Sequence, residues 1–235
     1  MSTTADSINA AERRALREDG VVYVRTGEAV GSGTLLYDGR AVLTAGHVVE
    51  AVTNADNLSV QFNTTQGSAI RQIDGFAIHP EYDSRLYGKD LALLWLADGA
   101  PVEANRYVLY RDSDELGQIT SLVGYGGSGT GAEGTQPNTI GTRRLVENRL
   151  DADAKAIDGL LGGRNTIELA ANERFLIDFD NGLSANDALG QLINVQGLGL
   201  GELEGMIAPG DSGGPALING QIAGVANAIA SLSDG

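Results

Sequence analysis

The chain has 235 residues, of which 42% are hydrophobic and 20% are charged, and its 31 acidic and 16 basic residues give a net charge of −15 at pH 7. These values are typical of a globular protein with an apolar core and exclude a disordered chain. The negative charge opposes binding to phosphate backbones and anionic lipids, so we expect neither nucleic acid nor a membrane as a partner.

The first twenty residues form a polar leader in which Ile8, Ala11 and Ala15 lie near helical spacing, a pattern that indicates a short helix. From residue 21 onward, short β-rich runs alternate with Gly, Asp and Asn turn residues, at 21–25, 33–37, 41–44, 58–62, 91–96 and 119–123. The 33 glycines, about twice the average usage, fit many tight turns. This pattern predicts antiparallel β structure in two units, which we place at residues 21–117 and 118–235.

Two segments have the composition of ligand-binding loops, and each lacks an essential residue. Residues 126–135 are glycine-rich like a phosphate-binding loop but lack its Gly-Lys-Ser/Thr ending, so we expect a flexible loop. The sequence Asp-Phe-Asp-Asn-Gly at residues 178–182 resembles part of a calcium loop, but its glycine comes one position early and no glutamate closes it. We expect a solvated turn there, and we predict no metal site and no cofactor.

The sequence Gly-Asp-Ser-Gly-Gly-Pro at residues 210–215 contains the strongest candidate for a nucleophile. Glycines on both sides of Ser212 permit the positive φ angles and the close backbone approach that a catalytic turn requires. Taken alone, the segment is also compatible with a plain glycine turn that carries an incidental serine.

Two histidines are present, and their surroundings differ. His47 follows an apolar strand-like run and lies among small residues that leave room for an imidazole, so it is the candidate general base. His79 begins a proline turn, which favours a surface or packing role, and we assign it no chemistry. Asp90 opens the apolar run at 91–96 and is the candidate acid that would hold the imidazole tautomer, although a strand-edge aspartate can also simply end a loop.

Three motifs together resemble the signatures of the trypsin-like serine peptidases, in that family's order. They are Thr-Ala-Gly-His at residues 44–47, Asp-Leu-Ala-Leu-Leu at 90–94 and Gly-Asp-Ser-Gly-Gly-Pro at 210–215. His-Pro-Glu-Tyr at 79–82 and Gly-Tyr-Gly at 124–126 are similar to further elements of the family. The resemblance runs from about residue 21 to residue 229, and it is to the bacterial type in particular.

The resemblance implies an all-β, chymotrypsin-like fold of two packed six-stranded antiparallel β-barrels. It implies a catalytic triad in which Ser212 is the nucleophile, His47 is the general base and Asp90 orients the histidine, with the amides of Gly210 and Ser212 as the oxyanion hole. The motif around Ser212 also matches the nucleophile elbow of α/β-hydrolases, but no histidine follows Ser212, as that class requires.

The sequence departs from the family's pattern in three places. No Ile-Val-Gly-Gly start precedes the first strand, so the partner of Asp211, which in many relatives is a new N-terminal ammonium, is left open. Residues 127–199 contain an insertion between the second and third motifs. The sequence stops at Gly235, soon after the strand beside the specificity pocket, so either it is a fragment or the second barrel is completed differently.

By the same resemblance, the floor of the specificity pocket lies six residues before the nucleophile, at a methionine. Because this position offers no buried anion, we expect an apolar primary specificity. Glu202 and Glu204 lie close in sequence and leave a basic preference open. The predicted substrate-binding residues are Met206, Ile207, Asn227, Ala228 and Ile229.

The expected function is therefore a serine endopeptidase acting on proteins or peptides, and the alternative is a non-catalytic binding module on the same fold. The sequence has no cysteine and begins without the basic start and apolar run of a signal peptide. We expect secretion from a bacterium, which would then require a C-terminal signal beyond Gly235. The oligomeric state stays open.

Overall fold

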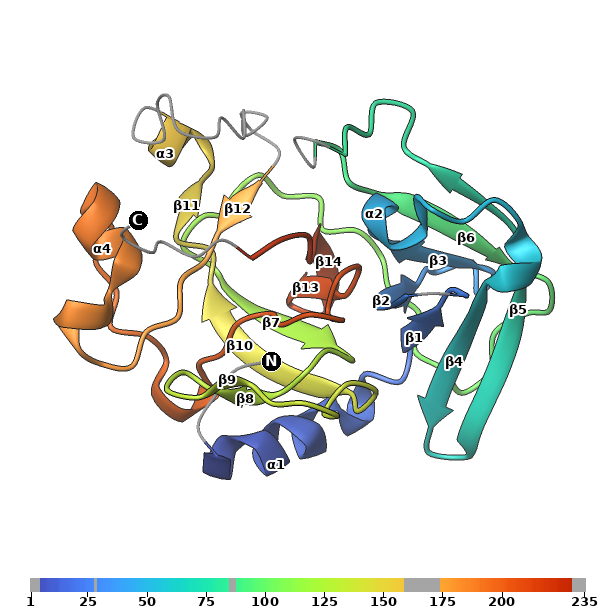
Figure 1. Ribbon diagram of the computed structural model, residues 1–235, viewed down its shortest axis with the longest axis horizontal. Helices are drawn as coiled ribbons and strands as arrows, with labels where there is room; N and C mark the ends of the chain where they lie inside the picture. Colours follow the sequence, from blue (N-terminus) through green and yellow to red (C-terminus); the bar gives the residue numbers. More distant parts are fainter. Residues whose placement is uncertain (1–4, 28, 85–87, 159–173, 230–235) are drawn as a thin grey trace.

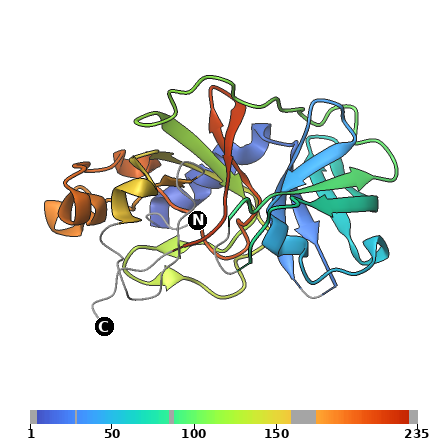
Figure 2. The same ribbon diagram turned by 90° about the horizontal axis from the view of Figure 1, so that it is seen from above.

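The computed structural model describes residues 5–27, 29–84, 88–158 and 174–229. Two β units lie side by side, with a closed barrel at one end of the molecule and helix α4 (Ala188–Ile193) at the other (Figures 1 and 2). A helix α1 (Ala5–Arg14) and a 3₁₀ turn η1 (Ala15–Arg17) precede the barrel. No described helix has the length and apolar character needed to cross a membrane.

The first unit is a closed barrel of six antiparallel strands in the order β1-β2-β3-β6-β5-β4. Alternate residues of these strands point inward, and the buried set includes Val24, Val42, Phe62 and Leu94, each fully buried. This closure pairs every strand on both sides and leaves no exposed edge. The strands are β1 (Val21–Arg25), β2 (Val30–Leu35), β3 (Ala41–Thr44), β4 (Ser59–Thr64), β5 (Gly67–Ile78) and β6 (Ala92–Leu96).

The second unit is built on a four-stranded sheet in the order β10-β7-β13-β14. Its strands are β7 (Ile119–Gly124), β10 (Arg144–Arg149), β13 (Pro215–Ile218) and β14 (Gln221–Val225). Two small sheets flank it: β8 (Gly129–Thr130) with β9 (Gly134–Thr135), and β11 (Ala152–Asp153) with β12 (Phe175–Leu176).

This second sheet differs from the six-stranded barrel expected from the sequence, although the all-β, chymotrypsin-like class is confirmed. Single parallel bridges cover both of its edges: Leu109 pairs with Ile222 of β14, and Glu204 pairs with Glu147 of β10. Within the described residues, irregular segments therefore pair with the two edge strands at positions where a closed barrel would have further strands.

Helix α1 packs against the second unit beside β10 (Figure 1). Its residue Ala11 and the following Ala15 are buried, and Arg144 of β10 forms an ion pair of 3.0 Å with Glu12. The neighbouring Arg143 donates to the Ala15 carbonyl at 3.0 Å. The polar leader is thus anchored to the second sheet through two buried arginines.

The first part of the glycine-rich segment after β7 is packed, whereas a flexible loop was expected for residues 126–135; residues 131–135 are exposed. Residues 126–129 are all buried, and the Gly126 amide donates to Asp211 Oδ1 at 2.8 Å. A Cβ atom at Gly126 would lie 2.5 Å from the Asp211 carboxyl carbon, so the close approach requires glycine there. The expectation was wrong for residues 126–129, because glycine permits tight backbone packing as well as mobility. The remaining helical elements are α2 (Gly46–Val49), η2 (Ala55–Asn57), α3 (Lys155–Asp158), η3 (Ser184–Asn186) and η4 (Gly201–Leu203).

Candidate active site

The register of β3 against β6 brings the candidate base and acid together. Thr44, the last residue of β3, lies opposite Ala92, the first residue of β6. His47 follows β3 by three residues, on the short helix α2, and Asp90 precedes β6 by two. Both side chains therefore lie just beyond the same end of this strand pair.

Asp90 uses both of its carboxylate oxygens on His47. Oδ1 accepts the His47 backbone amide at 2.8 Å, and Oδ2 lies 2.6 Å from the imidazole Nδ1. The Asp90 side chain is 1% exposed, whereas that of His47 is 21% exposed. Because a carboxylate only accepts hydrogen bonds, Nδ1 carries the proton that faces it, which leaves Nε2 as the nitrogen able to act as a base.

The Ser212 turn is held against the first barrel by a buried serine of β2. The Ser32 amide donates to the Ser212 carbonyl at 2.7 Å, and its hydroxyl donates to the Gly210 carbonyl at 2.9 Å. The carbonyl of the same serine accepts the Thr44 hydroxyl at 2.7 Å. Ser32 thereby links the backbone of Ser212, itself half-buried, to the strand end that leads into His47.

Gly213 makes the close approach of these two segments possible. Its φ angle is +85°, and a Cβ atom there would collide with the Thr44 hydroxyl and the Ser32 carbonyl. Any other residue would force the Ser212 turn away from the strand before His47. Ser32 was not predicted as a site residue, because its role depends on contacts with residues more than 170 positions away.

The peptide plane before Gly210 has a fixed orientation. The Pro209 carbonyl accepts the Gly127 amide at 2.9 Å. In a planar trans peptide the carbonyl and the following N–H point in opposite directions, so the Gly210 N–H is directed away from Gly127.

The peptide plane before Ser212 is held in the same way, since the Asp211 carbonyl accepts the Gly214 amide at 2.8 Å. Among the residues that the structure describes, the amides of Gly210 and Ser212 donate to no protein acceptor, while those of Asp211, Gly213 and Gly214 do. The turn therefore contains two backbone donors without a protein acceptor, which is the number of amide donors that the predicted oxyanion hole would use.

Asp211 has backbone partners inside the second unit. Its side chain is buried, with Oδ1 accepting the Gly126 amide at 2.8 Å and Oδ2 accepting the Ala208 amide at 2.9 Å. These bonds tie the Ser212 turn to the end of β7 and to the segment just before the turn. Both carboxylate oxygens thus have protein donors without the new N-terminal ammonium considered from the sequence.

We expect Asp211→Asn to lower the free energy of unfolding by about 3 kcal/mol, because the asparagine NH₂ group must face one of two amide donors and leave it unsatisfied. Urea denaturation would measure the loss. Asp112→Asn, which makes the same chemical change at an exposed position, serves as the matched control. Equal stability of the two variants would show that the two hydrogen bonds accepted by the Asp211 carboxylate do not stabilise the fold.

A family model named trypsin matches residues 8–151, which is more than half of the chain. The chain belongs to the trypsin family. The matched region contains His47 and Asp90 and ends before Ser212. A comparison with curated protein sequences finds no match.

Two solved structures show the fold that this trypsin-family chain shares. One is the inactivated protease paralogue S-D1 of the scabies mite, with a TM-score of 0.68, 17% identity and coverage of 93% of this chain and 84% of that one. The other is neuropsin, a serine protease expressed in the limbic system of mouse brain, with a TM-score of 0.65 and 19% identity. The match covers 89% of this chain and 82% of the neuropsin chain. At these identities the likeness shows the fold alone. Neither protein is bacterial, so the narrower expectation of a bacterial type stays a prediction.

The predicted substrate-binding residues lie in two segments beside the Ser212 turn. Met206 is half-buried, and Ile207 packs against the apolar cluster of Ala11, Leu122, Val146 and Ala216. Ala226 pairs with the turn through the Gly213 amide and the Gly214 carbonyl, each at 2.8 Å. The chain then continues into Asn227, Ala228 and Ile229, the last two of which are exposed. Their contact with substrate remains a prediction.

Proposed function

We propose that the protein is a serine endopeptidase in which Ser212 is the nucleophile, His47 is the general base and Asp90 orients the imidazole. The observation that carries this proposal is the pair of hydrogen bonds between His47 and Asp90, with an Nδ1–Oδ2 distance of 2.6 Å. This pair lies at the end of β3, and Ser32 connects the same strand end to the Ser212 backbone. Trypsin-family membership makes proteins or peptides the substrate class.

In the proposed reaction, Ser212 Oγ attacks the peptide carbonyl carbon while His47 Nε2 takes the hydroxyl proton. The amides of Gly210 and Ser212 stabilise the negative oxygen of the tetrahedral intermediate, and Asp90 stabilises the imidazolium. The C–N bond then breaks as the imidazolium protonates the leaving amine, which gives an acyl-enzyme. Water, deprotonated by the same nitrogen, hydrolyses that ester and restores the serine.

A non-catalytic binding module is the second candidate, because one structural neighbour is an inactivated protease paralogue. Fold alone does not separate the two. The catalytic proposal is supported by the contact between His47 and Asp90 and by the two amides of the Ser212 turn that donate to no described protein acceptor. Reaction of the serine with a fluorophosphonate separates the candidates directly, since it requires an assisted nucleophile.

An apolar primary specificity is part of the proposal. Glu204 is one of the two nearby acids that left a basic preference open, and it is buried and already engaged: Oε1 accepts from Asn148 at 3.1 Å and Oε2 accepts the Leu200 amide at 2.8 Å. The other acid, Glu202, is exposed. Burial also raises the pKa of Glu204 to about 7. Turning the Glu204 side chain toward a substrate would break both bonds, which disfavours Glu204 as the partner of a substrate Lys or Arg.

Cleavage of a mixed peptide library should therefore occur mainly after Leu, Phe or Ala. Mass spectrometry of the products reads the preference directly, and the Ser212→Ala protein controls for contaminating peptidases. Dominant cleavage after Arg or Lys would contradict the apolar pocket while leaving the triad intact. Secretion from a bacterium remains a separate proposal, tested by locating the full-length protein in culture fractions.

A further inference from the structure

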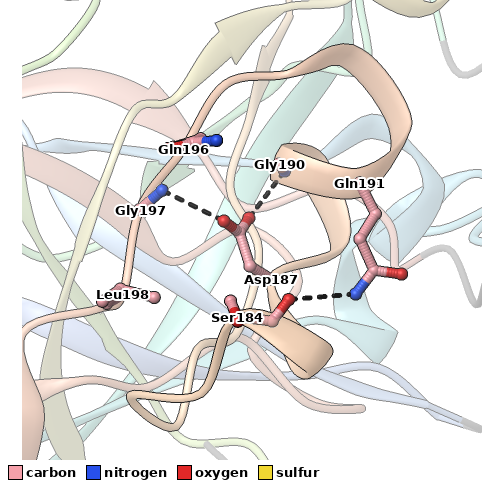
Figure 3. A pocket seen from close by; sticks show the side chains of 7 residues that line it. All are labelled: Ser184, Asp187, Gly190, Gln191, Gln196, Gly197 and Leu198. Atoms are coloured by element: carbon pink, nitrogen blue, oxygen red, sulfur yellow. Dashed lines mark hydrogen bonds between the residues drawn. The ribbon is translucent and has the colours of Figure 1, made fainter.

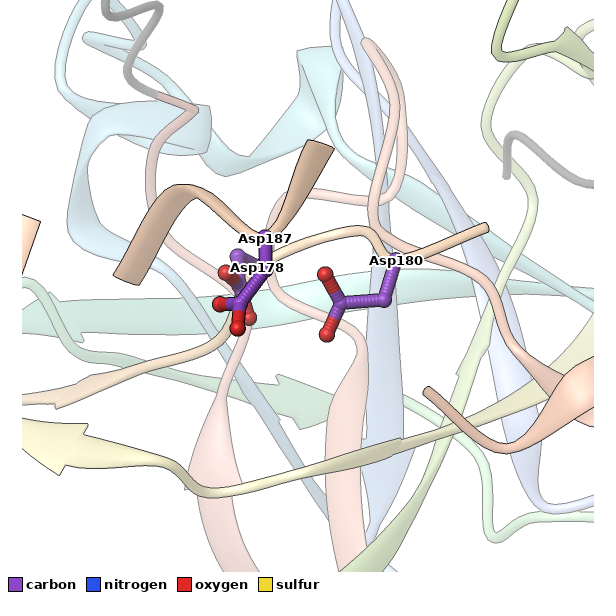
Figure 4. Close-up of side chains that lie close together, drawn as sticks. All are labelled: Asp178, Asp180 and Asp187. Carbon is purple, nitrogen blue, oxygen red and sulfur yellow. The ribbon is translucent and has the colours of Figure 1, made fainter. Parts of the chain in front are cut away.

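Three aspartates lie close together near the start of helix α4 (Figure 4). Asp178 and Asp180 follow β12, and Asp187 immediately precedes α4. One carboxylate oxygen from each lies within 4.8 Å of the other two. Asp180 is 7% exposed and Asp187 5% exposed, so the solvated turn expected for residues 178–182 is wrong at Asp180.

Two of these carboxylates have protein donors. Asp178 Oδ2 accepts the Leu189 amide at 2.8 Å. Asp187 caps α4 by accepting the Gly190 amide at 2.6 Å with Oδ1, and its Oδ2 accepts the Gly197 amide at 3.3 Å (Figure 3). Capping alone would account for these two residues.

Asp180 is different, because its Oδ1 is buried and has no hydrogen-bond partner. Its carboxylate is turned toward the other two (Figure 4). A buried carboxylate oxygen without a donor is costly, and like charges close by add to the cost. Burial, followed by the charges of Asp178 and Asp187, raises the pKa of Asp180 to about 6. The site thus has the charge and the free ligand atom that a cation would satisfy.

We propose that Asp178, Asp180 and Asp187 bind one calcium ion. Calcium takes oxygen ligands at about 2.3–2.6 Å, so oxygens on opposite sides of the ion are about 5 Å apart, and its shell of six to eight ligands tolerates irregular geometry. Magnesium demands a smaller octahedral shell and gives up water reluctantly, so this loosely spaced trio suits calcium better.

A surface pocket of about 420 Å³ borders the aspartate cluster, because Asp187 is part of its lining (Figure 3). The other lining residues include Ser184, Gln191 and Gln196, whose polar atoms suit a hydrated cation. None of the candidate catalytic residues lines this pocket. The calcium site is therefore separate from the proposed active site.

Hydrogen bonds connect the aspartates to the segment that precedes Ser212. The buried Asn148 of β10 donates through Nδ2 to the carbonyls of Asp178 and Gly205, at 2.7 and 2.9 Å, and to Glu204 Oε1. Calcium bound to the aspartates would consequently hold residues 178–187 against β10 and the segment leading to Met206.

Calorimetric titration of the full chain with CaCl₂, after removal of metal with a chelator, tests the proposal. We expect one saturable site with a dissociation constant below about 1 mM, a higher Tm in calcium, and at least tenfold weaker binding of MgCl₂. Asp180→Asn should weaken calcium binding at least tenfold and should raise the Tm of the metal-free protein, because it removes an unpaired buried charge. A purely structural aspartate would not give that second effect.

Asp112→Asn and Ser212→Ala are the controls, and both should bind calcium like the wild type. If Asp180→Asn fails to fold, Asp178→Asn replaces it, since its amide oxygen can still accept from Leu189. The proposal is overturned if the wild type shows no saturable calcium binding at millimolar concentrations, if magnesium binds equally well, or if the folded aspartate variant binds calcium like the wild type. These outcomes do not depend on peptidase activity.

Discussion

Replacing Ser212 or His47 by alanine is expected to lower peptidase turnover by about 10⁶-fold while leaving the fold intact. The nucleophile and its base act as one unit, so the double variant should be no less active than either single variant. Residual hydrolysis would come from substrate binding and the oxyanion hole alone. Turnover on the preferred library peptide, with circular dichroism as a control for folding, measures the effect.

The fold should survive these changes for a local reason. The bonds that hold the Ser212 turn use its carbonyl and the hydroxyl of Ser32, and neither involves the Ser212 side chain. His47 is partly exposed, so its removal leaves no large buried cavity. A folded alanine variant with turnover close to the wild type would show that the triad assignment is incorrect.

Asp90→Asn is expected to lower turnover by about 10⁴-fold, the size of the effect that this change has in serine peptidase triads. Asp90 accepts two hydrogen bonds from His47, one from the backbone amide and one from Nδ1. An asparagine that keeps the backbone bond must turn its NH₂ group toward Nδ1. Nδ1 must then be the acceptor, the ring proton moves to Nε2, and His47 can no longer take the proton of Ser212.

The same peptide assay measures this variant, with Asp112→Asn as the matched control. A drop of less than tenfold for Asp90→Asn would mean that the contact between Asp90 and His47 does not set the tautomer. An equal drop in both variants would point to a general effect of the substitution and would contradict a specific role of Asp90.

Most of the barrel strands could be predicted from local sequence patterns, and the motifs around His47 and Asp90 singled out two residues that the structure places in contact. Residues 21–25 and 41–44 are short β-rich runs bounded by turn residues, and the structure has β1 and β3 over the same residues. Strand β5 was missed, although it is the longest, because among its twelve residues only Ile73 is buried. It forms through pairing with β4 and β6 on both sides, which no local pattern reveals.

The surroundings of Ser212 and the aspartate cluster could not be predicted from the sequence, because both are formed by contacts between residues that are distant along the chain. Ser32 and the buried glycine Gly126 reach the Ser212 turn from distant parts of the chain. Asp180 lies in a turn-like sequence, and its burial becomes visible only when α4 and the segment containing Gly199 pack against it. From composition alone we expected a flexible loop around Gly126 and a solvated turn around Asp180, since Gly, Asp and Asn are common in exposed turns.

Covalent labelling by a fluorophosphonate, followed by intact-mass measurement, tests most directly whether Ser212 is an activated nucleophile. We predict one adduct per chain for the wild type, none for Ser212→Ala, and greatly slowed labelling for His47→Ala, since reaction needs both the hydroxyl and its base. A wild-type chain that stays unlabelled, or an adduct that persists in Ser212→Ala, would contradict the proposed peptidase mechanism.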